Sequence, residues 1–264
     1  MKLLFFKALW GMEGTLEDKL SRAAAHGYAG VEMPLPPVGE EALLEALLER
    51  HGLQLIVQLF TDGDHVASFR QQMERAAAFR PAAIVSHSAR DAMPEEEQDR
   101  FFDAALEIER RHGATVCHET HRGRAMFTPW TTSRLLRKFP ELKLAADFSH
   151  WMAVCESHLE DQQDHLEQAI ARSFHIHGRI GHPQGPQVPH PAAPEYAREL
   201  ELFTGWWRDI AAVRRAAGSP QLTFTAEFGP PGYLPTLPFT RQPVADLWEL
   251  NEWMREHARE RLQG

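Results

Sequence analysis

Short apolar runs alternate along the whole chain with longer segments in which apolar residues recur every three or four positions. The short runs are typical of buried strands, and the longer period is typical of helices that cover them. Eight strands are predicted, at residues 3–9, 29–33, 53–60, 82–87, 114–119, 142–148, 173–178 and 222–228. Clear helical spacing lies between them, for example at residues 16–27, 40–52, 68–79 and 95–113.

Several of the helical segments end at a glycine that suits a left-handed cap, namely Gly27, Gly52, Gly113 and Gly218. Eight strand–helix units in 264 residues average about 33 residues each, which indicates a parallel sheet that closes on itself. We therefore predict an α/β fold, a single-domain (β/α)8 TIM barrel over residues 1–264. The alternative is a doubly wound open sheet, but "LWGMEGT" after the first strand matches its glycine-rich phosphate loop poorly.

Two long loops interrupt the regular alternation, at residues 180–194 after the seventh strand and 229–243 after the eighth. Loops of this length in a compact domain are usually lids or binding loops, and packing against a second subunit of a homo-oligomer is the alternative. The stretch "FHIHGRIGHPQGPQVPHP" begins like a buried strand and continues into the first of these loops. We expect its proline-rich part to be a stiff flap that closes over a site at little entropic cost.

Composition disfavours several classes of protein. The chain is 43% hydrophobic, has no run of 18 apolar residues, and begins with "MKLLFFKALWG", which lacks a signal-peptide cleavage site. The two cysteines, Cys117 and Cys155, have neither metal-type nor redox-type spacing, so we expect a cytoplasmic protein without a membrane segment. A formal net charge of −9 without a basic run disfavours binding to nucleic acid.

Candidate chemistry lies at the carboxyl ends of the last four strands, which contain "CHETHRGR", "ADFSHW", "HIHGRIGH" and "TAEFGPP". Because strand ends of a TIM barrel converge on one site, we expect Glu119, Asp147, Glu227 and one of His175 and His177 at a common depth. Three carboxylates and an imidazole form a hard ligand set suited to Mn²⁺, Mg²⁺ or Co²⁺. A divalent cation would also offset the repulsion among neighbouring carboxylates.

Strand geometry favours one of the two histidines. Residues two apart point to the same side of a strand, and the one nearer the carboxyl end reaches the barrel mouth. We therefore predict that His177 is the ligand and that His175 lies one layer deeper. His150, three residues after Asp147, is expected to hydrogen-bond a substrate oxygen, with a helix cap as the alternative.

Other side chains near strand ends are candidates for binding the substrate. Those that we predict to bind it, besides His150, are Lys7, His87, His121, Arg122, Trp151 and Arg179. The arginines, together with Arg124, would neutralise an oxyanion, phosphate or carboxylate, or else form surface ion pairs. Trp10, Trp151 and Phe60 would form an apolar wall against a sugar face, with core packing as the alternative. Weaker candidates are Glu32, His118 and His182.

With Glu, Asp-x-x-His, His and Glu on its last four strands, the chain resembles the xylose isomerase-like TIM-barrel superfamily over essentially its whole length. It is most similar to the branch of sugar phosphate isomerases and epimerases, through "HETHRGR", "DFSHW", "GPQVPHP" and "EFGPPGYLPTLPF". This resemblance implies that Glu119, Asp147, His177 and Glu227 bind one divalent metal ion. Mn²⁺ is preferred, and Mg²⁺, Co²⁺ and Zn²⁺ are alternatives. It also implies that Glu119 and Glu227 act as acid and base.

The function implied by the resemblance is isomerisation or epimerisation of a keto-sugar in carbohydrate metabolism, by carboxylate-mediated proton transfer through a metal-bound enediolate. Alternatives are a metal-dependent lyase, dehydratase or C-glycoside-cleaving enzyme on keto-sugars, and a non-catalytic metal-binding barrel. An endonuclease IV-like phosphodiesterase is disfavoured, because "GHPQGPQVPHP" lacks the Asp-x-His pair that such a site needs after strand seven. The sequence does not distinguish isomerase from epimerase, and it does not identify the sugar.

Overall fold

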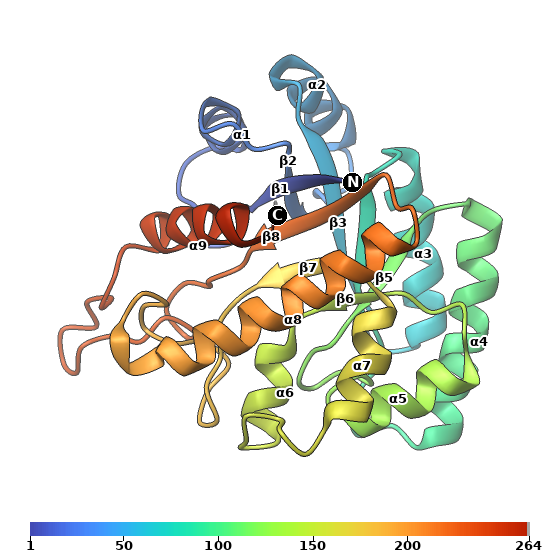
Figure 1. The fold of residues 1–264 in the computed structure, drawn as a ribbon. Helices are drawn as coiled ribbons and strands as arrows, with labels where there is room; N and C mark the ends of the chain where they lie inside the picture. The colour runs from blue at the N-terminus through green and yellow to red at the C-terminus, as the bar shows by residue number, and fades with distance from the viewer. Residues whose placement is uncertain (263–264) are drawn as a thin grey trace.

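The computed structural model describes residues 1–262, and its eight parallel strands close into a barrel in sequence order (Figure 1). The strands are β1 (Lys2–Ala8), β2 (Gly30–Pro34), β3 (Gln54–Phe60), β4 (Ala83–His87), β5 (Val116–Glu119), β6 (Leu144–Ala146), β7 (Ser173–Gly178) and β8 (Gln221–Ala226). The predicted TIM barrel is thereby confirmed. The sixth strand is shorter than expected, because Asp147 accepts a hydrogen bond from the Ser149 amide and caps a helix that begins at Phe148.

Helices surround the barrel and cover the outward side of its strands, with α8 and α9 packed on each other and on β8 (Figure 1). They are α1 (Leu16–Ala25), α2 (Glu41–His51), α3 (His65–Ala78), α4 (Glu95–His112), α5 (Pro129–Lys138), α6 (Phe148–Val154), α7 (Gln163–Ala171), α8 (Ala197–Ala216) and α9 (Leu247–Leu262), with a 3-10 turn η1 (Pro194–Tyr196) before α8. The four predicted cap glycines all have positive φ. Within residues 1–262, every helix is too short or too polar to cross a lipid bilayer.

Successive strand residues point alternately into the barrel and toward the helices, which divides the core in two. The inner cluster is small and consists of Phe6, Ile56, Ala83, Val85, Cys117 and Ala145. The outer cluster is much larger and lies between the strands and the helices. Because the small inner cluster fills the barrel interior, the inward positions nearer the mouth are free for polar side chains.

The two predicted long loops are present, after β7 and after β8, and they brace each other. The Gln187 side chain accepts a hydrogen bond from the Gly229 amide at 2.7 Å and donates one to the Gly229 carbonyl at 3.3 Å. Val188 in the same loop is fully buried. None of residues 180–193 is among the described side chains that line the main cavity, and the contacts of this segment support the loop after β8. Its closure over the site as a flap stays a prediction.

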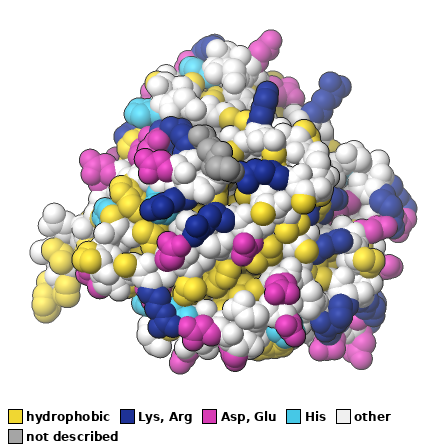
Figure 2. Space-filling model, in the orientation of Figure 1, with side chains coloured by type: hydrophobic (Ala, Val, Ile, Leu, Met, Phe, Trp, Pro, Cys, Tyr) yellow, Lys and Arg dark blue, Asp and Glu magenta, His cyan; other side chains and the backbone are white. Residues whose placement is uncertain are grey.

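The loop after β8 also forms a projecting turn, in which Thr236 and Pro243 form an isolated antiparallel β-bridge. Leu237 is 48% exposed and Phe239 is fully exposed near its tip. Figure 2 shows hydrophobic side chains projecting at the left edge of the molecule, where this loop lies in Figure 1.

Candidate metal centre and active site

The four side chains predicted as metal ligands come together at the carboxyl-terminal mouth of the barrel. Glu119 ends β5, Asp147 follows β6, His177 is the penultimate residue of β7 and Glu227 follows β8. All four are buried, and one potential ligand atom from each lies within 4.8 Å of the others. The inward parity of the strands brings these residues together, although they are up to 108 positions apart in the sequence.

His177 is at the centre of this group. Its Nδ1 lies 3.3 Å from Glu119 Oε1 and 3.1 Å from Glu227 Oε2, and its Nε2 lies 2.9 Å from Glu32 Oε1. Burial alone would lower the pKa of His177, but the carboxylates of Glu227, Glu32 and Glu119 raise it well above its ordinary value. Since Glu32 accepts from Nε2, Nδ1 is the nitrogen presented to the other carboxylates.

Glu32, from β2, is held by four hydrogen bonds below this centre. Its Oε1 accepts from His177 Nε2 and from Gln58 Nε2 at 3.1 Å. Its Oε2 accepts from Thr225 Oγ1 at 2.5 Å and from His175 Nε2 at 3.2 Å. Burial opposes ionisation, but His177 and His175 lower the pKa of Glu32 below its ordinary value. His175 therefore lies one layer deeper than His177, as strand parity predicted.

Arg179 provides the positive charge on the other side of the group. Its guanidinium forms an ion pair with Asp147, donates to His150 Nε2 at 2.8 Å, and lies 3.4 Å from Glu227 Oε2. Arg179 is only 1% exposed. Burial raises the pKa of Asp147 to about 6 even though Arg179 opposes the shift, because Glu227 and Glu119 add to it. The arginine thus neutralises only part of the buried negative charge.

The donor set fits a divalent cation. Among the described residues, Glu119 Oε2 and Glu227 Oε2 are buried without a hydrogen-bond partner. His87 Nε2 lies 2.6 Å from Glu119 Oε2, but the two groups are not oriented for a hydrogen bond. Burial would raise the pKa of Glu119, yet His87, His177 and His121 hold it well below its ordinary value. Two glutamates with an Oε2 that accepts no hydrogen bond, beside an imidazole nitrogen and a third carboxylate, suit Mn²⁺ or Mg²⁺.

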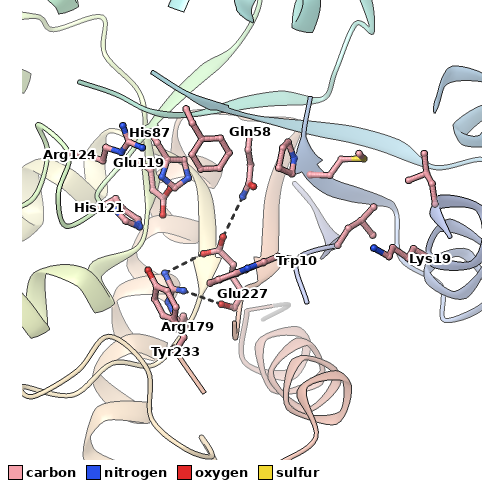
Figure 3. A pocket seen from close by; sticks show the side chains of 15 residues that line it. Trp10, Lys19, Gln58, His87, Glu119, His121, Arg124, Arg179, Glu227 and Tyr233 are labelled. Atoms are coloured by element: carbon pink, nitrogen blue, oxygen red, sulfur yellow. Dashed lines mark hydrogen bonds and ion pairs between the residues drawn. The ribbon is translucent and has the colours of Figure 1, made fainter. Parts of the chain in front are cut away.

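A cavity of about 630 Å³ opens onto this group (Figure 3). Its polar side is lined by Gln58, His87, Glu119, His121, Arg124, Arg179 and Glu227. Its apolar side is lined by Leu9, Trp10, Leu16, Met33, Pro34, Phe60 and Tyr233, with Lys19 beyond them. Trp10 and Phe60 thus take the wall positions expected for them. The volume is within the usual range for small-molecule sites, roughly 300–1,000 Å³.

Three histidines form a second polar group beside Glu119. The ring centroids of His87 and His121 are 4.9 Å apart, and those of His121 and His150 are 3.8 Å apart. Burial lowers the pKa of His121 to about 4, and burial with His121 and Arg179 nearby lowers that of His150 well below its ordinary value. At neutral pH both rings are therefore uncharged and act as hydrogen-bonding groups.

Four of the predicted substrate-binding residues lie outside the cavity wall, namely Lys7, Arg122, His150 and Trp151. His150 lies behind it and contacts the lining residue Arg179. The prediction for Lys7 is wrong, because its odd position on β1 turns it outward, between the barrel and the helices. Trp151 is fully buried, donates to the Met126 carbonyl at 2.9 Å and stacks on Phe148, so it is a core residue. Arg122 instead lies 5.1 Å from the Tyr233 ring centroid.

Sequence reasoning gives too little weight to one residue, Glu32, and misses two, Gln58 and Tyr233. Glu32 was only a weak candidate, although its place on β2 gives it the same inward parity as the other carboxylates. Gln58 was not considered, yet it links Glu32 to Glu227 Oε1 at 3.1 and 3.4 Å. Tyr233 comes from the loop after β8, and its ring centroid lies 4.7 Å from the Arg179 guanidinium carbon. No periodic pattern indicates where such a loop residue will lie.

Comparisons with known proteins agree with this architecture. The family model described as "Xylose isomerase-like TIM barrel" matches residues 20–228. No curated protein matches the sequence.

Solved structures share the fold at low sequence identity. A D-tagatose 3-epimerase-like protein is 14% identical with a TM-score of 0.61, covering 100% of this chain and 97% of that one. A xylose isomerase-like TIM barrel protein from Mycobacterium smegmatis in complex with magnesium is 10% identical with a TM-score of 0.61, covering 98% and 97%. The probable 3-DHS dehydratase AsbF from Bacillus anthracis is 16% identical with a TM-score of 0.55, covering 86% and 92%.

Proposed function

The chain belongs to the xylose isomerase-like TIM-barrel family, and from this premise we propose that it is a divalent-metal-dependent isomerase or epimerase of keto-sugars. The observation that supports this proposal most strongly is the meeting of Glu119, Asp147, His177 and Glu227 at the floor of a cavity of about 630 Å³. The Oε2 atoms of the two glutamates, which accept no hydrogen bond, would then serve both a cation and proton transfer.

Glu119, Asp147, Glu227 and His177 Nδ1 would hold the ion, for which we propose Mn²⁺ first and Mg²⁺, Co²⁺ or Zn²⁺ as alternatives. A bound divalent ion polarises a substrate carbonyl and stabilises negative charge on its oxygen. The carboxylate-rich donor set supports this choice, and the similar fold from Mycobacterium smegmatis was solved with magnesium.

The chain's own groups would move the proton. Glu119 is ionised at neutral pH and faces the cavity, so it can accept a proton from the carbon next to the carbonyl. Glu227, whose Oε2 lies near the same His177 Nδ1 as Glu119 Oε1, would in its protonated form return a proton to carbon. Exchange with solvent would then remove the proton from Glu119 and restore the one on Glu227. Return to the other face of the same carbon inverts that centre, whereas return to the neighbouring carbon interconverts ketose and aldose. Arg179 would donate to a substrate oxygen from the cavity wall.

A dehydratase or other lyase acting on keto-sugars is the second candidate. The structural similarity to a probable dehydratase supports it. The same proton abstraction would begin that reaction. His87 or His121 on the cavity wall would donate a hydrogen bond to the leaving group. In either case the partner is a small molecule, and the net charge of −9 argues against nucleic acid.

The test is incubation of the protein with a panel of keto-sugars in D₂O, after chelation and reloading with each of the four metal ions. We expect solvent deuterium at the carbon next to the carbonyl, detected by NMR, and we expect it to depend on the ion. An isomerase or epimerase returns labelled sugar, whereas a lyase releases a shortened or unsaturated product. Absence of deuterium uptake with every sugar and ion would contradict the proposal.

A further inference from the structure

A second cavity, of about 400 Å³, lies on the other side of Trp10 from the metal centre. Its wall includes Lys7, Trp10, Arg22, Pro230, Asp246 and Trp248. Lys7 lies on the outer side of β1, Arg22 comes from α1, and Trp248 comes from α9. None of the proposed metal ligands lines it, so its chemistry is separate from that of the main cavity.

Lys7 is the unusual feature of this second cavity. Its side chain is 2% exposed, and among residues 1–262 it makes no hydrogen bond and has no carboxylate within 4.0 Å. An ammonium group buried without a counter-ion in direct contact is costly, because it has lost most of its hydration. Glu252 favours the charged form of Lys7 only from beyond 4.0 Å. Burial lowers the pKa of Lys7 to about 8, so the group is still mostly charged at neutral pH.

Two of the neighbouring acids, Glu252 and Asp246, are already engaged, and the third, Glu13, lines the cavity but does not come within 4.0 Å of Lys7. Glu252 is the acid that acts on the charge of Lys7, but its carboxylate accepts a hydrogen bond from Tyr28 Oη and lies 2.9 Å from Arg255. Asp246 accepts from the Glu249 amide at 2.9 Å near the start of α9. The fold therefore leaves the Lys7 charge without a partner of its own.

Aromatic contacts compensate only partly for this charge. Lys7 Nζ lies 5.2 Å from the centroid of Trp248, and the Arg22 guanidinium carbon lies 3.6 Å from the same ring. A single indole thus lies beside two cations that face one cavity. Both cations are available to an anion that enters, and Trp10 and Pro230 offer an apolar surface beside it.

We propose that this second cavity is a binding site for a small anion, a carboxylate or phosphate group, which pairs with Lys7 and Arg22. The anion supplies the counter-charge that the fold withholds from Lys7. Any apolar part of the ligand lies against Trp10 and the prolines. Trp10 and Trp248 both line this cavity, and Trp248 is absent from the wall of the main cavity, so a change in tryptophan fluorescence is expected when an anion binds here.

The experiment measures binding of inorganic phosphate and of acetate to the metal-loaded protein, by tryptophan fluorescence and by calorimetry. Lys7→Met removes the buried charge, and Lys2→Met removes an exposed charge from the opposite end of the same strand. We expect saturable binding that is at least tenfold weaker in Lys7→Met and unchanged in Lys2→Met. We also expect the anion to raise the Tm of the wild type and of Lys2→Met but not that of Lys7→Met.

Arg22→Met, on the exposed side of α1, is a second variant that serves if Lys7→Met does not fold, and we expect it to weaken binding at least threefold. Tighter binding of phosphate would identify a phosphorylated ligand, and tighter binding of acetate an organic acid. The inference is overturned if neither anion binds saturably, or if binding is equally strong without Lys7 and without Arg22. Binding that persists in both variants would place the anion elsewhere, for example at the metal.

Discussion

The two cavities that share Trp10 hold buried charge of opposite sign. At the barrel mouth the charge is negative, and Arg179 and His177 offset part of it through direct contacts with Asp147 and Glu227. Behind Trp10 the charge is positive, and Lys7 has no such partner within the described chain. Burial of charge is costly in both places, so each cavity needs a ligand of the opposite sign.

Strand parity produces this difference. Glu32 and Glu227 occupy inward positions, where side chains from several strands meet and can share protons and hydrogen bonds. Lys7 pairs with Val31 and Ala226, which point outward into the apolar layer under the helices. A shift of one residue along a strand thus decides whether a charge joins a network or stays alone.

The largest effect is expected at the negative cavity. Glu119→Gln keeps the shape of the side chain but removes the carboxylate that faces both His177 and the cavity. Loss of a general base lowers rates by roughly 10²–10⁴-fold, so we expect deuterium uptake from D₂O to fall about 10³-fold.

Glu109→Gln is the matched control for this variant. Glu109 is also a buried glutamate that accepts from a histidine, His118 Nε2 at 2.9 Å, but it lies on α4 outside the barrel. We expect its deuterium uptake to match the wild type. Equal losses in the two variants would show that the effect comes from disturbed folding.

The next effect concerns the positive cavity and is a pH dependence of stability. The pKa of Lys7 in the folded state is about 8, below its ordinary value of 10.5. Between these two pH values the unfolded chain binds more protons than the folded one, so the free energy of unfolding rises with pH. Across this whole pH window, the free energy of unfolding gains about 3 kcal/mol from Lys7.

Urea unfolding at several pH values across this window measures the gain as a difference between wild type and Lys7→Met. Subtraction removes the titration of all other groups that the two proteins share. We expect the wild type to gain stability relative to Lys7→Met as the pH rises, and Lys2→Met to behave like the wild type. A constant difference would mean that Lys7 titrates as an exposed lysine does.

The sequence predicted the barrel and the convergence of Glu119, Asp147, His177 and Glu227, because both follow from alternation along strands. The errors concern residues close to a strand end whose direction was not considered. Lys7 was assigned to the mouth by its position along β1, although its parity turns it outward. Trp151 follows Asp147 by four residues, but a short helix turns it into the core.

The sequence also does not show which residues of distant strands contact one another, even where it names the residue as a weaker candidate. Glu32 is one acid among 37 acidic residues, and nothing near it in sequence indicates contact with His177, which is 145 positions away. Its role depends on the angle at which β2 faces β7 across the closed barrel, and that angle is set by tertiary packing.

The third effect is expected on metal affinity. Glu32→Gln removes the negative charge that accepts from His177 Nε2, so the ring is less firmly held with Nδ1 toward the centre. Loss of such a partner usually weakens metal binding by about 10–100-fold, and calorimetric titration with Mn²⁺ measures it. Glu109→Gln again serves as control. Unchanged affinity in Glu32→Gln would show that packing alone orients His177.

The smallest effect tests the wall between the two cavities. A Cβ on Gly229 would lie 2.4 Å from two atoms of the Trp10 ring, so Gly229→Ala forces one of the two to move. The Gly229 backbone is held by two hydrogen bonds with the Gln187 side chain, one donated by the Gly229 amide and one accepted by its carbonyl. Trp10, in contrast, is 39% exposed. We therefore expect the Trp10 side chain to move. Overpacking of this kind costs roughly 1–3 kcal/mol, and we expect the lower part of that range because the ring can move toward solvent.

Displacement of Trp10 alters both cavities at once, which separates this variant from those that affect one charge. We expect Gly229→Ala to raise KM for the keto-sugar and Kd for the anion by several-fold each, without loss of metal. Gly205→Ala is the control, because a Cβ there meets nothing within 4 Å in the middle of α8. It should stabilise the protein by about 0.5–1 kcal/mol and leave both constants unchanged. If Gly229→Ala altered only one constant, Trp10 would belong functionally to that cavity alone, and the two charged sites would be independent.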